Sequence, residues 1–349
     1  MRMLPRNLVK EGVAILIVML GLLRLGRWLR IQVLVRPRIT LLCYHRITAQ
    51  GALISPQCIS PVMFDMQIRH LTSHYQIISL DDVADYLRGD FHLETDAIAV
   101  TFDDGYQDNY TEALPILAKY GVLACFFVAS APLLDDQSYW IDDLSVLLEA
   151  IHGTNTTFSL AELPTLAQQI TEFIGASATT KRKRAKDIFL ALNRLGEQQK
   201  YAVLSALRTA CQAAGCKPGT TPALMTAEQL LALAHAGQHI GAHTVSHPRL
   251  SNLEPDEVVR EITNGLDRLR QHVGGVHYFA YPFGKLADIP KDHAALFTTL
   301  ETSGIDLAVT TEDGVVAPDD HRYLVPRTVM SAQSLAMTQL KLERLAWQR

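Results

Sequence analysis

Short apolar runs alternate with amphipathic segments along most of the chain. Runs rich in β-branched and aromatic residues lie at 38–45, 76–80, 97–102, 123–129, 238–244, 276–282, 306–311 and 322–330. Segments with apolar residues at helical spacing lie between them, at 60–75, 80–90, 109–121, 226–237, 255–273 and 291–302. This alternation is typical of a parallel sheet closed or covered by helices. The sequence therefore predicts an α/β fold with seven or eight strands.

The alternation stops between about 140 and 235. That stretch has a helical pattern and contains no convincing strand, so we interpret it as a helical insertion in a domain spanning 38–331. An amphipathic helix at 332–349 follows the domain. The basic run "KRKR" (181–184) is expected to be a solvated helix face, and contact with phosphate or a membrane is the alternative.

The first 37 residues have a different pattern. Residues 12–23 are apolar and uncharged, but a membrane span needs about 20 such residues. Arginines then recur every third residue, with a tryptophan and leucines between them, which favours a helix in the headgroup region of a membrane. We therefore expect 1–37 to be a membrane-associating segment. An ordinary amphipathic helix packed on the domain is the alternative.

The positive charges after the apolar run indicate on which side of a membrane the domain would lie. If the segment spanned a bilayer, its basic flank would tend to stay cytoplasmic. The flank consists of Arg24, Arg27, Arg30, Arg36 and Arg38. The expected location is the inner membrane with a cytoplasmic catalytic domain, and the periplasmic face is the alternative.

The composition gives information on three properties: overall order, nucleic-acid binding and the state of the cysteines. The chain has 349 residues, of which 48% are hydrophobic and 19% charged, so a large core is available and global disorder is excluded. The net charge of −4 gives no argument for a nucleic-acid partner. The five cysteines have no C-x-x-C spacing and are expected to be free thiols, although Cys211 and Cys216 are close enough in sequence to pair.

Two polar clusters follow predicted strands. Asp103 and Asp104 follow 97–102, either as a solvated turn or because they bind a cation. His243 and His247 lie at the end of the run 238–244 and just after it, either as satisfied polar residues or as two ligands facing one point. Two histidines and one aspartate at strand ends of one barrel would make a three-ligand metal site with open positions. The second carboxylate would then be free to act as a base, which indicates metal-assisted hydrolysis.

The motifs "TFDDG" (101–105) and "HTVSH" (243–247) together resemble the first two motifs of the polysaccharide deacetylase family, carbohydrate esterase family 4. This family includes chitooligosaccharide, peptidoglycan and exopolysaccharide N-deacetylases, and the resemblance covers roughly 38–130 and 225–330. It implies a distorted (β/α)7 barrel, with Asp103 as catalytic base and Asp104, His243 and His247 as metal ligands. Thr244 would shape the histidine loop. Zinc is the expected ion, with cobalt, nickel or manganese as alternatives.

The sequence departs from the family pattern at two places. "YFAYPFG" (278–284) takes the place of the family's Arg-x-Pro-aromatic motif, but Ala280 stands where the arginine that orients the base is expected. Arg327 is our candidate to replace it, and a surface arginine is the alternative. The family's late Leu-x-His, which provides the general acid, has no clear match. His45 is the candidate acid because it ends the first strand, and His321 is a weaker one.

Aromatic residues near these motifs are expected to line a sugar groove. The expected substrate-binding residues are Tyr106, Trp140, Tyr281, Pro282 and Phe283. For Trp140 and the nearby Asp142, a buried helix start is the alternative.

The resulting hypothesis is a metal-dependent hydrolase that removes an N-acyl group, expected to be acetyl, from an amino sugar in a polysaccharide or glycan precursor. Two alternatives stay open. One is a deacylase or deformylase of a polyprenyl-phosphate-linked sugar at the inner membrane, which the N-terminal segment favours. The other is a catalytically silent carbohydrate-binding module, which the missing arginine and unclear acid favour.

Overall fold

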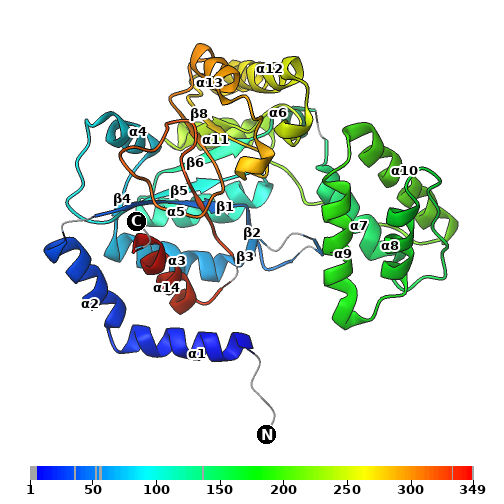
Figure 1. Cartoon of the computed structure of the whole chain (residues 1–349), viewed down its shortest axis with the longest axis horizontal. Coiled ribbons are helices and arrows are strands. Elements are labelled where there is room, and N and C mark those ends of the chain that lie inside the picture. The colour runs from blue at the N-terminus through cyan, green and yellow to red at the C-terminus, as the bar shows by residue number, and fades with distance from the viewer. Residues whose placement is uncertain are drawn as a thin grey trace, which may run out of the picture.

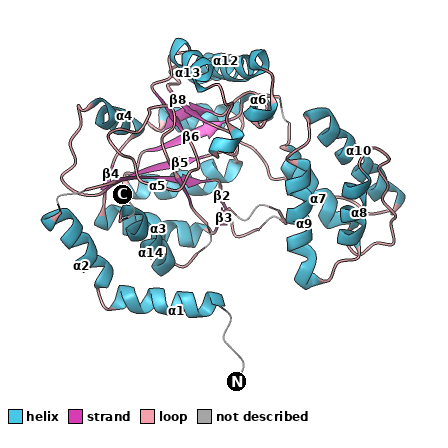
Figure 2. Cartoon of the chain, in the orientation of Figure 1, coloured by secondary structure: helices cyan, strands magenta, loops and turns pink. Residues whose placement is uncertain are grey.

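Parallel strands form a curled sheet at the centre of the molecule (Figures 1 and 2). The order across it is β10 (Thr328–Val329), β1 (Ile39–Tyr44), β5 (Ala97–Phe102), β6 (Ala124–Val128), β7 (His239–Ala242), β8 (Tyr278–Ala280) and β9 (Leu307–Val309). Strand β4 (Gln76–Ile77) pairs with the start of β5. A bridge between Val309 and Val325 joins β9 to the segment before β10, so the sheet closes as a distorted barrel. The predicted α/β barrel is confirmed.

The computed structural model describes residues 6–34, 37–51, 53–54, 57–135, 137–331 and 333–347, without the side chains of 6–9. Residues 1–5 and Arg36 of the predicted membrane-associating segment lie outside the described residues. All five cysteines are free thiols, as expected.

The strands are buried on both faces, which explains their nearly continuous apolar sequences. In β5, Ile98, Val100 and Phe102 pack outward against the helices, whereas Ala97 and Ala99 face the interior of the barrel. The outer layer contains α3 (Pro61–His74), α4 (Leu80–Arg88), α5 (Leu114–Tyr120), α6 (Ser130–Leu134), α11 (Ala227–His235), α12 (Pro255–Val273), α13 (His293–Thr302) and α14 (Leu335–Ala346). A π-helical turn at Asn109–Ala113 leads into α5, and β2 (Arg46–Ile47) pairs with β3 (Cys58–Ile59) beside the barrel.

The last predicted strand, 322–330, was too long. Only Thr328 and Val329 pair with β1 as a strand, and Val325 contributes the bridge to β9. Pro326 lies between these two pairings and has no backbone N–H to donate to a neighbouring strand, so the ladder is interrupted there.

Four helices form a separate lobe beside the barrel, on the right in Figure 1. They are α7 (Trp140–Ile151), α8 (Pro164–Ile174), α9 (Ala178–Leu192) and α10 (Glu197–Ala213), and they enclose their own apolar core. The insertion ends earlier than the predicted residue 235, because Leu230 and Leu233 of α11 pack into the barrel core. Lys181, Lys183 and Arg184 of the basic run pair with acidic side chains on the lobe surface.

The N-terminal segment forms two helices, α1 (Arg6–Met19) and α2 (Leu22–Trp28), followed by a π-helical turn at Leu29–Val33. Gly21 has a φ of 69° at the junction, where the chain bends by 63°. Neither helix alone is long and apolar enough to cross a membrane, although the bent pair meets that requirement by length and composition. Both helices pack on α14 (Figure 1).

Candidate active site

The polar residues predicted to act together lie at one end of the barrel. Asp103 and Asp104 follow β5, and His243 follows β7, so the carboxyl ends of two parallel strands bring them to the same edge. His247 reaches the same point from the turn after β7. Its Nε2 lies 3.4 Å from Asp104 Oδ1, and the Nε2 of His243 lies 3.6 Å from that oxygen.

These three side chains fit a cation. Their ligand atoms all lie within 4.8 Å of one another. The Nδ1 of His243 lies 2.7 Å from the Ala280 carbonyl oxygen, which can only accept, so Nδ1 carries the proton and Nε2 is left as a ligand. Burial raises the pKa of Asp104, but the two adjacent imidazoles favour its ionised form, outweigh burial and hold that pKa well below the usual range. A carboxylate and two imidazoles are ligands that suit zinc and related ions.

Unusual backbone conformations gather around this point. Four non-glycine residues have a positive φ in the described part of the chain: Asp104 (74°), Thr244 (71°), His247 (59°) and Phe283 (61°). Such conformations cost free energy and persist only where surrounding contacts enforce them. In the histidine turn, Thr244 Oγ1 accepts a hydrogen bond from the His247 N–H at 3.0 Å, so Thr244 shapes the loop as expected. Strain concentrated here indicates a site built to aim side chains.

Asp103 is held by Arg327. The guanidinium donates to both carboxylate oxygens, at 2.7 and 2.8 Å, and also to Thr101 Oγ1 and the Thr310 carbonyl, each at 3.0 Å. Both side chains are buried. Burial alone would raise the pKa of Asp103, but the charge and hydrogen bonds of Arg327, together with the nearby His243 and His45, outweigh it and lower that pKa. A carboxylate held ionised without being a metal ligand suits a general base.

Arg327 therefore lies where the sequence argument placed it, and the surface alternative is wrong. Its guanidinium lies over the Phe127 ring, 5.2 Å from the centroid, inside the barrel. Ala280 belongs to the same interior cluster as Phe127. Arg327 thus contacts the carboxylate that the family's motif arginine is expected to orient, while position 280 is filled by a small residue.

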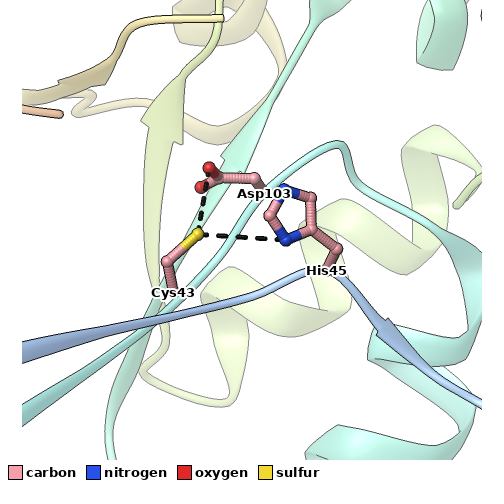
Figure 3. Close-up of side chains that lie close together, drawn as sticks. All are labelled: Cys43, His45 and Asp103. Carbon is pink, nitrogen blue, oxygen red and sulfur yellow. Dashed lines mark hydrogen bonds between the residues drawn. The ribbon is translucent and has the colours of Figure 1, made fainter. Parts of the chain in front are cut away.

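Cys43 and His45 complete the surroundings of Asp103 (Figure 3). The Cys43 Sγ lies 3.3 Å from Asp103 Oδ2 and 3.9 Å from His45 Nδ1. These three residues could also surround a cation, but both Asp103 oxygens already accept from Arg327. Burial raises the pKa of the Cys43 thiol well above its usual range, so the thiol stays protonated and donates to the carboxylate. This cluster favours a hydrogen-bonded base over a second metal site.

A cavity of about 500 Å³ opens between the barrel and the helical lobe. Asp103, Asp104, His45 and both metal-site histidines line its barrel side. The lobe contributes Trp140, Ile141 and Phe189, and Ile54 from the loop between β2 and β3 adds to this apolar wall. Lys186 and Asn193 of the lobe also line the cavity, so it can receive a polar group at the barrel side while the lobe offers both apolar and polar contacts.

Three of the five predicted substrate-binding residues line this cavity, namely Tyr106, Trp140 and Phe283. The other two do not. Tyr281 is buried in the barrel core and donates to the Tyr323 carbonyl, and Pro282 is buried in the turn that presents Phe283. The predictions for Tyr281 and Pro282 are wrong, because the side chain that faces the cavity is Phe283, the one after the proline. His321, the weaker acid candidate, stacks on Phe297, 4.1 Å between ring centroids, and does not line the cavity.

Two supporting residues were missed by sequence reasoning. The Tyr139 hydroxyl donates to the Asp104 carbonyl at 2.7 Å, and its ring packs edge-on against His247. Glu261 of α12 accepts from the Val245 and Ser246 N–H groups, each at 2.9 Å, and so fixes the histidine turn. Neither residue stands in a motif, and both act across long sequence separations, so no local signal could have identified them.

Sequence comparisons relate the chain to known proteins. A profile of the family described as polysaccharide deacetylase matches residues 92–171 and 181–299. YxkH of Bacillus subtilis (strain 168), whose name assigns it to the polysaccharide deacetylases, is 32% identical over 92 residues, which are 26% of this chain and 32% of YxkH.

Two solved structures share the fold. The Streptococcus pyogenes deacetylase PplD, in complex with acetate, has a TM-score of 0.56 at 18% identity, covering 89% of this chain and 99% of PplD. IcaB from Ammonifex degensii has a TM-score of 0.56 at 20% identity, covering 89% and 97%. With the profile matching more than half of its length, the chain belongs to the polysaccharide deacetylase family.

Proposed function

We propose that this protein is a metal-dependent hydrolase that removes an N-acyl group, in the simplest case acetyl, from an amino sugar of a polysaccharide or glycan precursor. The observation that carries the proposal is that two adjacent carboxylates have different surroundings. Asp104 faces two imidazoles, whereas Asp103 is held by a buried arginine and faces the same cavity. One binds and the other is available for proton transfer.

A divalent ion held by Asp104, His243 and His247 would polarise the amide carbonyl and favour ionisation of water beside it. Asp103 accepts the proton of the attacking water, and Arg327 keeps Asp103 ionised and correctly oriented. The water oxygen bonds to the acyl carbon, the C–N bond breaks, and the amine leaves after gaining a proton. His45 lines the cavity near Asp103 and is the candidate donor of that proton.

The second candidate substrate is an amino sugar carried on a membrane lipid, such as a polyprenyl phosphate. The apolar cavity wall of Ile54, Trp140, Ile141 and Phe189 favours it. So does α14, because Lys341 on this helix lines the cavity while the helix also packs against α1 and α2. A silent binding module is less consistent with the site, since sugar binding alone requires neither the buried Asp103–Arg327 pair nor the strained ligand turn.

The test incubates the metal-loaded full chain with N-acetylated oligosaccharides and with a lipid-linked amino sugar in vesicles. Released carboxylic acid and the mass of the product are measured, with Asp103→Asn as the matched control. We expect acid release and a free amine with the wild type alone. Release on neither substrate, from protein that has bound metal, would contradict the proposal and support the binding module. Equal rates on soluble and lipid-linked sugar would remove the lipid-linked candidate.

A further inference from the structure

The N-terminal helices present a concentrated apolar surface. Eleven of the nineteen large hydrophobic side chains that are exposed in the described chain lie within residues 13–34. On α1 they include Leu16 and Met19, which is 79% exposed, and Leu20 follows directly after this helix. From α2 onward Leu22, Leu25 and Leu29 recur at helical spacing on one face. We call the exposed apolar side chains of residues 13–34 the N-terminal apolar face.

The opposite side of these helices is fixed to the protein. Ala14 is fully buried, and α1 and α2 both pack on α14. The Arg30 guanidinium is buried and makes a two-point ion pair with Asp96, while Arg27 Nε donates to Glu343 at 2.8 Å. Removing one partner from a buried ion pair leaves an uncompensated buried charge, which is strongly destabilising. The helices therefore stay docked, and their outward face is the part available to a partner.

Charge identifies the partner. The first 37 residues contain seven basic and one acidic side chain, whereas the whole chain has a net charge of −4, so residues 38–349 carry −10. Lys10 and Arg24 are exposed beside the apolar side chains, and Trp28 is exposed on the same segment. Leucines, a tryptophan and cations on one exposed surface suit the interface of an anionic bilayer. The acidic remainder would be repelled from that surface.

We propose that the N-terminal apolar face docks the protein on the surface of an anionic membrane without spanning it. A straight span would require the 63° bend to open and the Arg27 and Arg30 pairs to break, leaving Asp96 and Glu343 buried without these cations. In the docked state α14 lies between the bilayer and the cavity, since α14 contacts α1 and also contributes Lys341 to the cavity lining. The cytoplasmic side predicted from the sequence stays a prediction.

The test measures binding of the full chain to sedimenting vesicles of phosphatidylcholine alone or mixed with phosphatidylglycerol. We expect strong binding to the mixed vesicles and weaker binding to the neutral ones. The double variant Met19→Asp/Leu20→Asp should bind the mixed vesicles at least tenfold less. Val62→Asp is the matched control, because Val62 is 72% exposed on α3, outside the N-terminal apolar face, and this variant should bind as the wild type does.

Folding and function are controlled separately. Thermal unfolding of both variants should match the wild type, since the altered side chains face solvent. Binding is scored without any sugar substrate, so it does not depend on the proposed hydrolase activity. Wild-type binding by the double variant would overturn the proposal. So would a soluble dimer that the double variant converts to monomer without any vesicle binding, or protein that alkaline carbonate fails to extract, which would indicate a spanning segment.

Discussion

Replacement of Arg327 by methionine tests how the catalytic carboxylate is held. The guanidinium makes two hydrogen bonds to Asp103, and Asp103 is only 2% exposed. Removing one partner of such a pair costs about 3–5 kcal/mol. If about 3 kcal/mol of that loss falls on the ionised form of Asp103, its pKa rises by about two units. Burial, which already opposes ionisation there, would then dominate.

The assay is kcat/KM for acyl release across a pH range from about 4 to 9. A general base must be ionised, so activity rises with pH through its pKa, and a raised pKa moves this acidic limb to higher pH. We expect that shift in Arg327→Met at acidic pH. A loss of about 100-fold should remain at neutral pH, where Asp103 is still ionised but is no longer held toward the attacking water. Arg327→Lys keeps the charge but loses the two-point geometry. Its kcat/KM and its acidic limb should lie between those of the wild type and Arg327→Met.

Arg322→Met is the matched control, because Arg322 lies near Arg327 in sequence but pairs with Glu301 at the surface. Its pH profile and kcat/KM should equal those of the wild type. An unchanged acidic limb and unchanged kcat/KM in folded Arg327→Met would refute the reasoning, since Asp103 would then need no arginine. If Arg327→Met does not fold, the Arg327→Lys profile decides the question in the same way.

Three further predictions follow from contacts around the site. The double variant Arg327→Ala/Ala280→Arg should be at least about tenfold more active than Arg327→Ala, because both positions face the barrel interior. No gain would mean that an arginine at position 280 cannot hold Asp103. Tyr139→Phe removes the donor to the Asp104 carbonyl, so metal affinity measured by chelator competition should fall about tenfold. Burial raises the pKa of Asp142 to about 7, so ionisation opposes folding as pH rises from about 4 to about 7. Wild-type stability should fall over that interval by at most roughly 4 kcal/mol, and urea unfolding of Asp142→Asn should lack this slope.

Periodicity identified the elements that carry the longest regular patterns. Strand 97–102 and helix 255–273 have the predicted bounds, because one is a continuous apolar run between polar residues and the other is a long amphipathic repeat. The pattern gave no sign of the separate core of the helical lobe, since helical spacing shows that one face is buried but not against which partner. The pattern did include the helix at 226–237 among the alternating elements, but it set the end of the insertion too late, at about 235.

Site residues in local motifs could be predicted from the sequence, whereas contacts that depend on strand register could not. Asp103, Asp104, His243 and His247 were found because parallel strand ends converge and because their spacing forms recognisable motifs. Arg327 was found only as a candidate. It was the arginine near a late strand end that could take the role of the arginine missing at position 280. The contact of Cys43 with Asp103 depends on the register between β1 and β5, where Cys43 lies opposite Thr101. No local pattern encodes that register, so the sequence predicts Cys43 only as one of five free thiols.

Asp103 and Asp104 are proposed to have different tasks, and measuring bound metal together with acyl release distinguishes these tasks. Bound divalent metal and acyl release from an N-acetylated amino sugar are determined on the same preparations of wild type, Asp103→Asn and Asp104→Asn. The account predicts that Asp103→Asn keeps one equivalent of metal but loses activity, whereas Asp104→Asn loses both. Loss of metal in Asp103→Asn, or metal retention with activity in Asp104→Asn, would contradict it.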